Sequence, residues 1–439
     1  MLKSCQQLLH AAHIITQNPQ RTHLENASIA VDKGRIVGIG TREEMQQTWQ
    51  AHKNKDLGKV LIMPGLVNAH THAAMTFLRG FADDMPLMDW LNQCIFPVEQ
   101  HLDANIVYHG ALLGYAEMLR TGTIGCIDMY LFEKAFLRAA VKAGIRCLGG
   151  QVIFSFPVPH CANHQAALEQ ARENVELYRN NPRVNIAINP HSVYTTTPKI
   201  LEDCRDTAEA LNLPLHLHLA ETANESTQCL SLWGKRPLPY CDDLGLLTQH
   251  TTLAHVVDVN AEDMDILARS GAVVAHNPSS NMKLASGVAP VPAMLARHIP
   301  VALGTDGAAS NNRLNIFTEM GRAALLHKSA LHDPTAMPAQ RVLDMATLDG
   351  ARAMHDTRLC QLVVGGPADM IALDLNAPNM HPLYEAASQL VYAATGMEVR
   401  MTMIEGEIVY EDGVMTRFDY PALLQEMESI SRWVRTHKK

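Results

Sequence analysis

The sequence predicts an α/β fold, a TIM-like (β/α)8 barrel joined to a small β-sandwich domain that both chain ends build. Three observations lead to this fold. Eight apolar, strand-like runs follow one another in the middle of the chain, helical patterns separate most of them, and short β-type segments lie near both ends. With 439 residues, the chain can accommodate one large barrel with additions.

The two ends carry matching β-type segments. Strand-like residues flank Gly34 near the amino end and Gly406 near the carboxyl end, and each glycine is typical of a hairpin turn because it accepts a positive φ. A further strand is expected over 368–374. We therefore expect residues 1–61 and 366–439 to form the β-sandwich, with a helix at the end of the second segment.

Residues 62–365 alternate between strand-like and helical patterns, which predicts parallel strands joined by helical crossovers. Two helices are clear, over 164–178 and 198–211, and the second has Thr197 as a suitable N-cap and Pro198 in its first turn. No glycine-rich dinucleotide fingerprint follows a strand, which argues against an open nucleotide-binding sheet. The expected strands are 62–70, 121–129, 145–154, 184–190, 213–219, 251–257, 272–275 and 301–305.

Composition excludes several classes of partner. The net charge of -9 is spread without a basic block, so we expect no binding to nucleic acid or to an anionic membrane surface. No run of about 18 apolar residues predicts a membrane span, and the polar start of the chain does not resemble a secretory signal. Nine cysteines without a Cys-x-x-Cys pair favour the reducing cytoplasm.

Two histidines, His70 and His72, end the first expected barrel strand. Residues i and i+2 of a strand point to the same side, so both imidazoles face one point, as a metal ion requires. A His-x-His pair alone is weak evidence, because such pairs also occur by accident. Its meaning depends on the partners that the fold brings to it.

Further polar residues gather where the other strands end, which is where a barrel places its chemistry. His218 and Asp306 are the best third and fourth ligands, since three imidazoles and one carboxylate suit zinc or iron(II). His216 shares the inward parity of His218 but lies farther from the strand end, so we expect it to serve in packing. The strand-end residues are His191, His218, Glu221, His255, His276, Asn277 and Asp306.

These motifs resemble the amidohydrolase superfamily, and the resemblance covers essentially the whole chain. Within that superfamily the chain is similar to the 5-methylthioadenosine/S-adenosylhomocysteine deaminases, which are related to triazine and guanine deaminases. The segment 86–99 is similar to the part of that family that faces the substrate. The motifs, in the family's order, are Pro-Gly-x-x-Asn-x-His-Thr-His at 64–72, His-Leu-x-Glu at 218–221, Leu-Ala-His at 253–255, His-Asn-Pro-x-Ser-Asn-x-Lys-Leu at 276–284 and Gly-Thr-Asp-Gly at 304–307.

The resemblance implies a metal-dependent hydrolytic deaminase. One divalent ion per subunit, usually zinc, would be bound by His70, His72, His218 and Asp306. Glu221 would protonate the purine nitrogen beside the carbon under attack. Asp306 would relay a proton from the attacking water to the departing amine, and His255 would steady the attacking hydroxide.

The resemblance also implies contacts to a purine nucleoside. Glu99 would bind the ribose hydroxyls and His191 the purine, while Trp90 would form a wall of the pocket, and Glu221 and Asp306 would also touch the substrate. Each has a structural alternative. Glu99 could begin a solvated helix, His191 could be a core histidine, and Trp90 could serve in packing alone.

One departure from the family bears on the substrate. Members that accept S-adenosylhomocysteine often carry an arginine after the third strand. In this chain the corresponding segment, 149–154, contains no arginine. Arg146 lies at the start of the strand, at the wrong end for the site. Without a bidentate arginine, an amino-acid tail binds less well than a small apolar one. This favours 5'-methylthioadenosine, adenosine or 5'-deoxyadenosine as substrates.

Three other functions remain open. The substrate could be another amino-heteroaromatic ring, such as guanine, cytosine or a triazine. A two-metal amide hydrolase would need a bridging lysine at the fourth strand, and 186–191 contains none. The third alternative is an inactive barrel that acts as an assembly partner, which should have lost ligands that this chain retains. The metal loaded, the preferred nucleoside and the oligomeric state, including a homo-oligomer, are not determined by the sequence.

Overall fold

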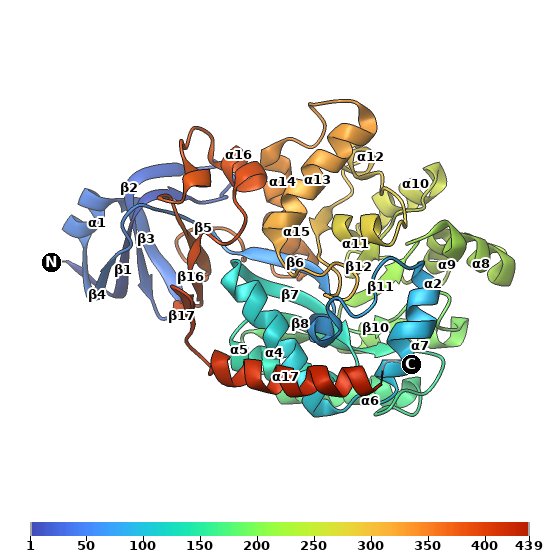
Figure 1. Cartoon of the computed structure of the whole chain (residues 1–439). Helices are drawn as coiled ribbons and strands as arrows, with labels where there is room; N and C mark the ends of the chain where they lie inside the picture. The colour runs from blue at the N-terminus through green and yellow to red at the C-terminus, as the bar shows by residue number, and fades with distance from the viewer. Residues whose placement is uncertain (1, 438–439) are drawn as a thin grey trace.

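The computed structural model describes residues 2–437 and contains one large mixed sheet and two parallel sheets (Figure 1). The mixed sheet combines strands from both chain ends, and helices surround the parallel sheets. Within residues 2–437, no helix is both long and apolar enough to cross a membrane. The mixed sheet has nine strands, in the order β18 (Val414–Met415), β17 (Glu407–Glu411), β16 (Val399–Ile404), β15 (Met370–Asp374), β5 (Val60–Pro64), β1 (Lys3–Ile15), β2 (His23–Asp32) and β3 (Arg35–Thr41), with β4 (Trp49–Asp56) paired to β1.

The mixed sheet joins the two ends of the chain. Strand β5 pairs with β1 from the amino end and antiparallel with β15 from the carboxyl end, and apolar residues from both ends share one core. Both expected hairpins are confirmed. Gly34 (φ +76°) lies between β2 and β3, and Gly406 (φ +74°) lies between β16 and β17. The expected terminal helix is α17 (Tyr420–Thr436).

The middle of the chain forms two sheets of parallel strands, as the alternating pattern predicted. Backbone hydrogen bonds link the sheets at both edges. At one edge the His216 amide donates to the Ile188 carbonyl at 3.0 Å, and at the other the Thr305 amide donates to the His70 carbonyl at 3.1 Å. The sheets are β10 (Asn189–Pro190), β8 (Arg146–Ile153), β7 (Thr123–Tyr130) and β6 (Leu66–Thr71) with β9 (Val184–Ile186) paired to β8, and β11 (Leu215–Leu219), β12 (Thr251–His255), β13 (Val273–His276) and β14 (Val301–Leu303).

The expected strand 62–70 is two strands, which corrects the prediction. Strand β5 belongs to the mixed sheet and β6 to a parallel sheet, and the chain passes from one to the other at Gly65. A Cβ on Gly65 would lie 2.2 Å from Ile124 Cγ2, so Gly65 lies too close to the Ile124 side chain of β7 to carry a side chain of its own. An apolar run does not reveal a change of sheet, because it stays buried on both sides of the change.

The helices follow the parallel strands and cover their outer face (Figure 1). Both helices predicted in detail are confirmed, as α6 (His164–Tyr178) and α7 (Pro198–Leu211), and the Thr197 side chain accepts from the Ile200 amide as the N-cap of α7. Other helices of this layer are α4 (Ala104–Arg120), α5 (Glu133–Ala143), α8 (Ala223–Trp233), α9 (Pro237–Asp243), α10 (Ala261–Ser270), α11 (Pro278–Lys283), α12 (Val291–Ala296), α13 (Ile316–Leu331), α14 (Ala339–Ala346) and α15 (Leu348–Ala353).

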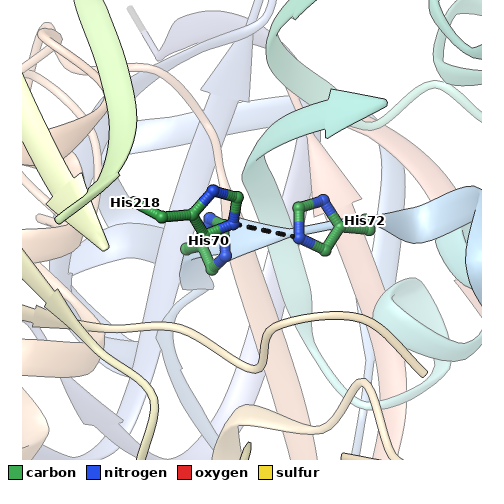
Figure 2. A group of neighbouring side chains, drawn as sticks. All are labelled: His70, His72 and His218. Atoms are coloured by element: carbon green, nitrogen blue, oxygen red, sulfur yellow. Dashed lines mark hydrogen bonds between the residues drawn. The ribbon is translucent and has the colours of Figure 1, made fainter. Parts of the chain in front are cut away.

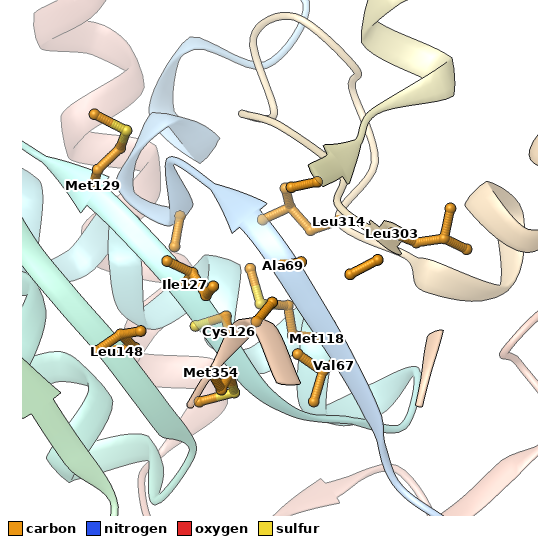
Figure 3. Close-up of a cluster of buried hydrophobic side chains, with 14 of the residues drawn as sticks. Val67, Ala69, Met118, Cys126, Ile127, Met129, Leu148, Leu303, Leu314 and Met354 are labelled. Atoms are coloured by element: carbon orange, nitrogen blue, oxygen red, sulfur yellow. The ribbon is translucent and has the colours of Figure 1, made fainter. Parts of the chain in front are cut away.

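Strand β6 illustrates how burial positions the site. Val67 and Ala69 lie among buried apolar side chains such as Met118 and Met354 (Figure 3). The alternate residue, His70, therefore points to the opposite face, and its side chain is fully buried. The strand is thus held by apolar contacts on one face and presents its histidine on the other.

The mixed sheet is tied to the parallel strands by a buried ion pair. Arg146, at the start of β8, donates to Asp369 through Nε at 2.6 Å and through Nη2 at 3.2 Å, and both residues are almost fully buried. Removal of Asp369 would leave the buried Arg146 guanidinium with the less buried Glu405, 3.4 Å from its Nη2, as its carboxylate neighbour, and such a loss is strongly destabilising.

Asp369→Ala should therefore lower the free energy of unfolding by about 3–5 kcal/mol in denaturant titrations. Glu173→Ala is the matched control, because the Glu173–Lys134 pair is about half exposed and should contribute less than about 1 kcal/mol. Equal, small effects of the two substitutions would contradict a role for the buried pair.

Candidate metal centre and active site

One cavity lies at the carboxyl ends of the parallel strands, where the sequence predicted the chemistry. It contains every predicted site residue except His70, which lies fully buried beside it. His276 does not reach the cavity; its Nε2 lies 3.3 Å from His327 Nε2 on α13. The cavity is lined by His72, Met75, Leu87, Trp90, Leu91, Ile95, Phe96, Glu99, Met129, Tyr130, Leu131, Val152, Phe154, His191, Tyr194, His218, Glu221, His255, Leu284, Asp306 and Ser310.

Three imidazoles converge at the base of this cavity (Figure 2). His70, His72 and His218 each offer a ring nitrogen, and these nitrogens lie within 4.8 Å of one another. The Nε2 atoms of His72 and His218 are 3.3 Å apart. Asp306 Oδ1 lies 3.4 Å from His70 Nε2 and 3.2 Å from His72 Nε2. Three imidazoles and a carboxylate thus face one point.

Hydrogen bonds determine which nitrogen of each ring is free. His72 Nδ1 donates to the Met129 carbonyl at 2.6 Å, and His218 Nδ1 donates to the His191 carbonyl at 2.9 Å. The Nε2 lone pairs of His72 and His218 therefore face each other. Two lone pairs at this distance do not form a hydrogen bond, whereas a cation between them would satisfy both.

His70 is oriented through His216, which the sequence assigned to packing alone. His216 Nδ1 donates to the Thr252 carbonyl at 3.0 Å, so its Nε2 accepts, at 2.8 Å, from His70 Nδ1. His70 Nε2 is then unprotonated, and this buried atom has no hydrogen-bond partner within residues 2–437. Burial lowers the pKa of His70 and His218 well below the usual value, so both rings remain neutral.

Asp306 is held with one oxygen toward the histidines. Oδ1 accepts from the Gly307 amide at 2.7 Å, and Oδ2 accepts from the hydroxyls of Ser280 at 2.6 Å and Ser310 at 2.8 Å. Burial opposes its charge, but the adjacent His70 and His72 rings outweigh burial and hold the pKa of Asp306 well below its usual value. The four side chains therefore fit a divalent metal ion.

Glu221 and His255 lie on one side of the cavity as a pair. His255 Nδ1 is 3.9 Å from Glu221 Oε1 and donates to Asn281 Oδ1 at 2.8 Å. Burial raises the pKa of Glu221, which favours a carboxyl group that can carry a proton. The sequence did not identify Asn281 as a partner of His255, because the contact joins helix α11 to the end of strand β12.

The residues expected to bind a nucleoside line the same cavity. Glu99 accepts from the Tyr130 hydroxyl at 2.7 Å, and burial raises the pKa of Glu99. Trp90 is buried and donates to the Ala82 carbonyl at 3.1 Å. His191 Nδ1 lies 2.9 Å from Thr195 Oγ1, and burial lowers its pKa to about 3. Tyr130 was not predicted as a site residue, although its position at the carboxyl end of β7 could have indicated one.

His218→Ala and Asp306→Ala should each remove a divalent ion, because each deletes one of four converging donors. Metal content after gel filtration, measured by plasma mass spectrometry, checks this. His13→Ala, in β1 of the mixed sheet, is the control and should retain the metal. Full metal occupancy in His218→Ala would contradict the site.

Comparisons with known proteins agree with this geometry. The Amidohydrolase family model matches residues 61–409. A 5-methylthioadenosine/S-adenosylhomocysteine deaminase of Desulfovibrio desulfuricans is 64% identical over 434 residues, 99% of each chain. A 5'-deoxyadenosine deaminase of Methanopyrus kandleri is 37% identical, over 94% of this chain and 95% of the relative. The crystal structure of an adenosine deaminase from Xanthomonas campestris with bound zinc superposes with a TM-score of 0.96 at 35% identity, over 99% of this chain and 100% of that one. The chain belongs to the amidohydrolase family.

Proposed function

We propose that the chain is a metal-dependent hydrolytic deaminase of adenine nucleosides. It converts 5'-methylthioadenosine to 5'-methylthioinosine with release of ammonia, and S-adenosylhomocysteine, adenosine and 5'-deoxyadenosine are related substrates. The observation that carries the proposal is that His70, His72 and His218 offer ring nitrogens within 4.8 Å of one another, with Asp306 Oδ1 3.4 Å from His70 Nε2 and 3.2 Å from His72 Nε2. Glu221 and His255 line the same cavity. The names of the relatives support the same reaction.

The chemistry divides among the residues of the cavity. His70, His72, His218 and Asp306 would hold one divalent ion per subunit, zinc or alternatively iron(II), which would supply Lewis-acid activation of water. Glu221 donates a proton to the purine nitrogen beside the attacked carbon, which makes that carbon more electrophilic. Asp306 accepts one proton from the attacking water and returns it to the amine as ammonia leaves, and the second proton of that water restores the acid form of Glu221 as the carbonyl forms. His255, oriented by Asn281, steadies the incoming oxygen.

The nucleoside lies between the metal ligands and the segment 86–99 in this proposal. Glu99, held by the Tyr130 hydroxyl, binds the ribose hydroxyls. His191 contacts the purine, and its neutral ring supports stacking or hydrogen bonding without a charge. Trp90 forms one wall of the pocket.

The lining of the cavity favours a small apolar group at the 5' position. No lysine or arginine occurs among the residues that line it within the described chain. Arg146 pairs with Asp369 at the start of β8, away from the carboxyl ends of the strands. A carboxylate on the substrate would lose its hydration without a bidentate partner.

The other functions have less support. Guanine, cytosine or triazine deamination would use the same metal and proton groups, so only pocket residues separate these substrates. This chain lacks the bridging lysine that a two-metal amide hydrolase requires, because 186–191 contains no lysine. An inactive assembly barrel does not require the complete donor set that converges here.

A separate proposal concerns the architecture of the chain. We propose that the two parallel sheets form one (β/α)8 barrel over about 62–365, which the bonds at both sheet edges support. The segments 1–61 and 366–439 then form a small β-sandwich domain, with β5 as the point of crossing. We also place the protein in the cytoplasm, which its nine free cysteines favour.

Glu221→Gln should keep the metal and lose at least about 10²-fold in kcat, because the amide cannot donate an acid proton. Ammonia release and metal content, measured on the same preparation, check this. Normal turnover by the Glu221→Gln enzyme would contradict the proton transfer.

The substrates should separate by their 5' groups. We expect kcat/KM for 5'-methylthioadenosine to exceed that for S-adenosylhomocysteine by 10-fold or more, since a desolvated, unpaired carboxylate costs on the order of 1–3 kcal/mol. Ammonia release from both nucleosides, with adenosine, 5'-deoxyadenosine, guanine and ammeline alongside, measures the difference. A preference for S-adenosylhomocysteine would contradict this assignment of the pocket, and a preference for guanine or ammeline would contradict the nucleoside assignment.

A further inference from the structure

The turn that carries Glu221 has an unusual backbone. Strand β11 ends at Leu219, and α8 begins at Ala223 with Thr222 as its N-cap. Between them Ala220 has φ +53°, in the left-handed region, a conformation that costs a residue other than glycine on the order of 1 kcal/mol. Something in the surrounding structure must therefore hold this turn.

Glu225 provides that restraint. Its side chain is 3% exposed, and it reaches back from the first turn of α8. Oε1 accepts from the Ala220 amide at 2.9 Å, and Oε2 accepts from the Glu221 amide at 2.8 Å. An acid at this position of a helix more often binds the N-cap amide, whereas Glu225 binds the amides of the two residues before the N-cap.

The same turn is bonded to the loop that follows His255. The amides of Val257 and Asp258 donate to the Ala220 carbonyl at 2.8 and 2.9 Å. His255 itself has φ +75°. The position of Ala220 thus affects both Glu221 and the segment that follows His255. Glu221 is the group assigned to proton transfer, and His255 is the group assigned to the incoming oxygen.

We infer that Glu225 is a positioning residue that clamps the Ala220–Glu221 backbone and so aims the Glu221 carboxyl group into the cavity. This inference rests on the proposed function. Glu225 is not among the residues that line the cavity, and each of its oxygens accepts a backbone amide, so it acts through Glu221. Burial of the Glu225 carboxyl group beside the acids Glu221 and Asp258 costs free energy. Its bonds to two backbone amides explain why an acid is present at this position.

Glu225→Gln tests the clamp with almost no change in volume. The amide keeps one acceptor and turns an NH2 group toward the other backbone N–H, so Glu221 loses its fixed direction. We expect kcat for 5'-methylthioadenosine to fall by about 10²-fold, while KM and metal content stay unchanged. Glu133→Gln is the matched control, because Glu133 is also a fully buried acid but lies outside the cavity, and its kcat should equal that of the wild type.

Two results would overturn the inference. Wild-type kcat in Glu225→Gln would exclude the clamp, and loss of metal with a raised KM would indicate a general structural role. Hydrogen–deuterium exchange gives a second measurement that does not depend on activity, and the Ala220 and Glu221 amides should exchange faster in Glu225→Gln alone. If the wild type releases no ammonia from any nucleoside, the proposed function fails, while unchanged exchange at these amides would separately refute the clamp.

Discussion

The site depends on one constraint, which is that unprotonated imidazole nitrogens and a carboxylate oxygen meet in a buried space. His72 and His218 give their Nδ1 protons to backbone carbonyls, and His70 gives its own to His216. Each bond leaves an Nε2 lone pair directed at Asp306 or at another ring. Such a cluster is unfavourable without a cation and favourable with one, so the hydrogen bonds orient these groups for the metal ion that we propose.

Parallel strands make this arrangement possible. Their carboxyl ends lie at the same edge of a sheet, so residues far apart in sequence become neighbours. His70 and Asp306 are an example, because the Thr305 and Asp306 amides both donate to the His70 carbonyl. The apolar residues of β6, such as Val67, hold the strand from its other face. The polar cluster therefore stands on a rigid apolar support.

The predictable features were those that depend on local pattern. The cap at Thr197 gave the start of α7, and strand-end positions brought His218, Glu221 and Asp306 into one group. Features that depend on neighbours were missed. Tyr130, Asn281 and the role of His216 follow from which strands and loops lie side by side, and the change of sheet at Gly65 leaves no mark in hydropathy.

Isotopic labelling tests the proposed hydrolytic deamination most directly. The metal-loaded protein is incubated with 5'-methylthioadenosine in water enriched in oxygen-18, and the products are identified by mass spectrometry together with an ammonia assay. We expect 5'-methylthioinosine with one labelled oxygen and an equal amount of ammonia. Release of free adenine, or unchanged nucleoside from a protein with full metal occupancy, would contradict it.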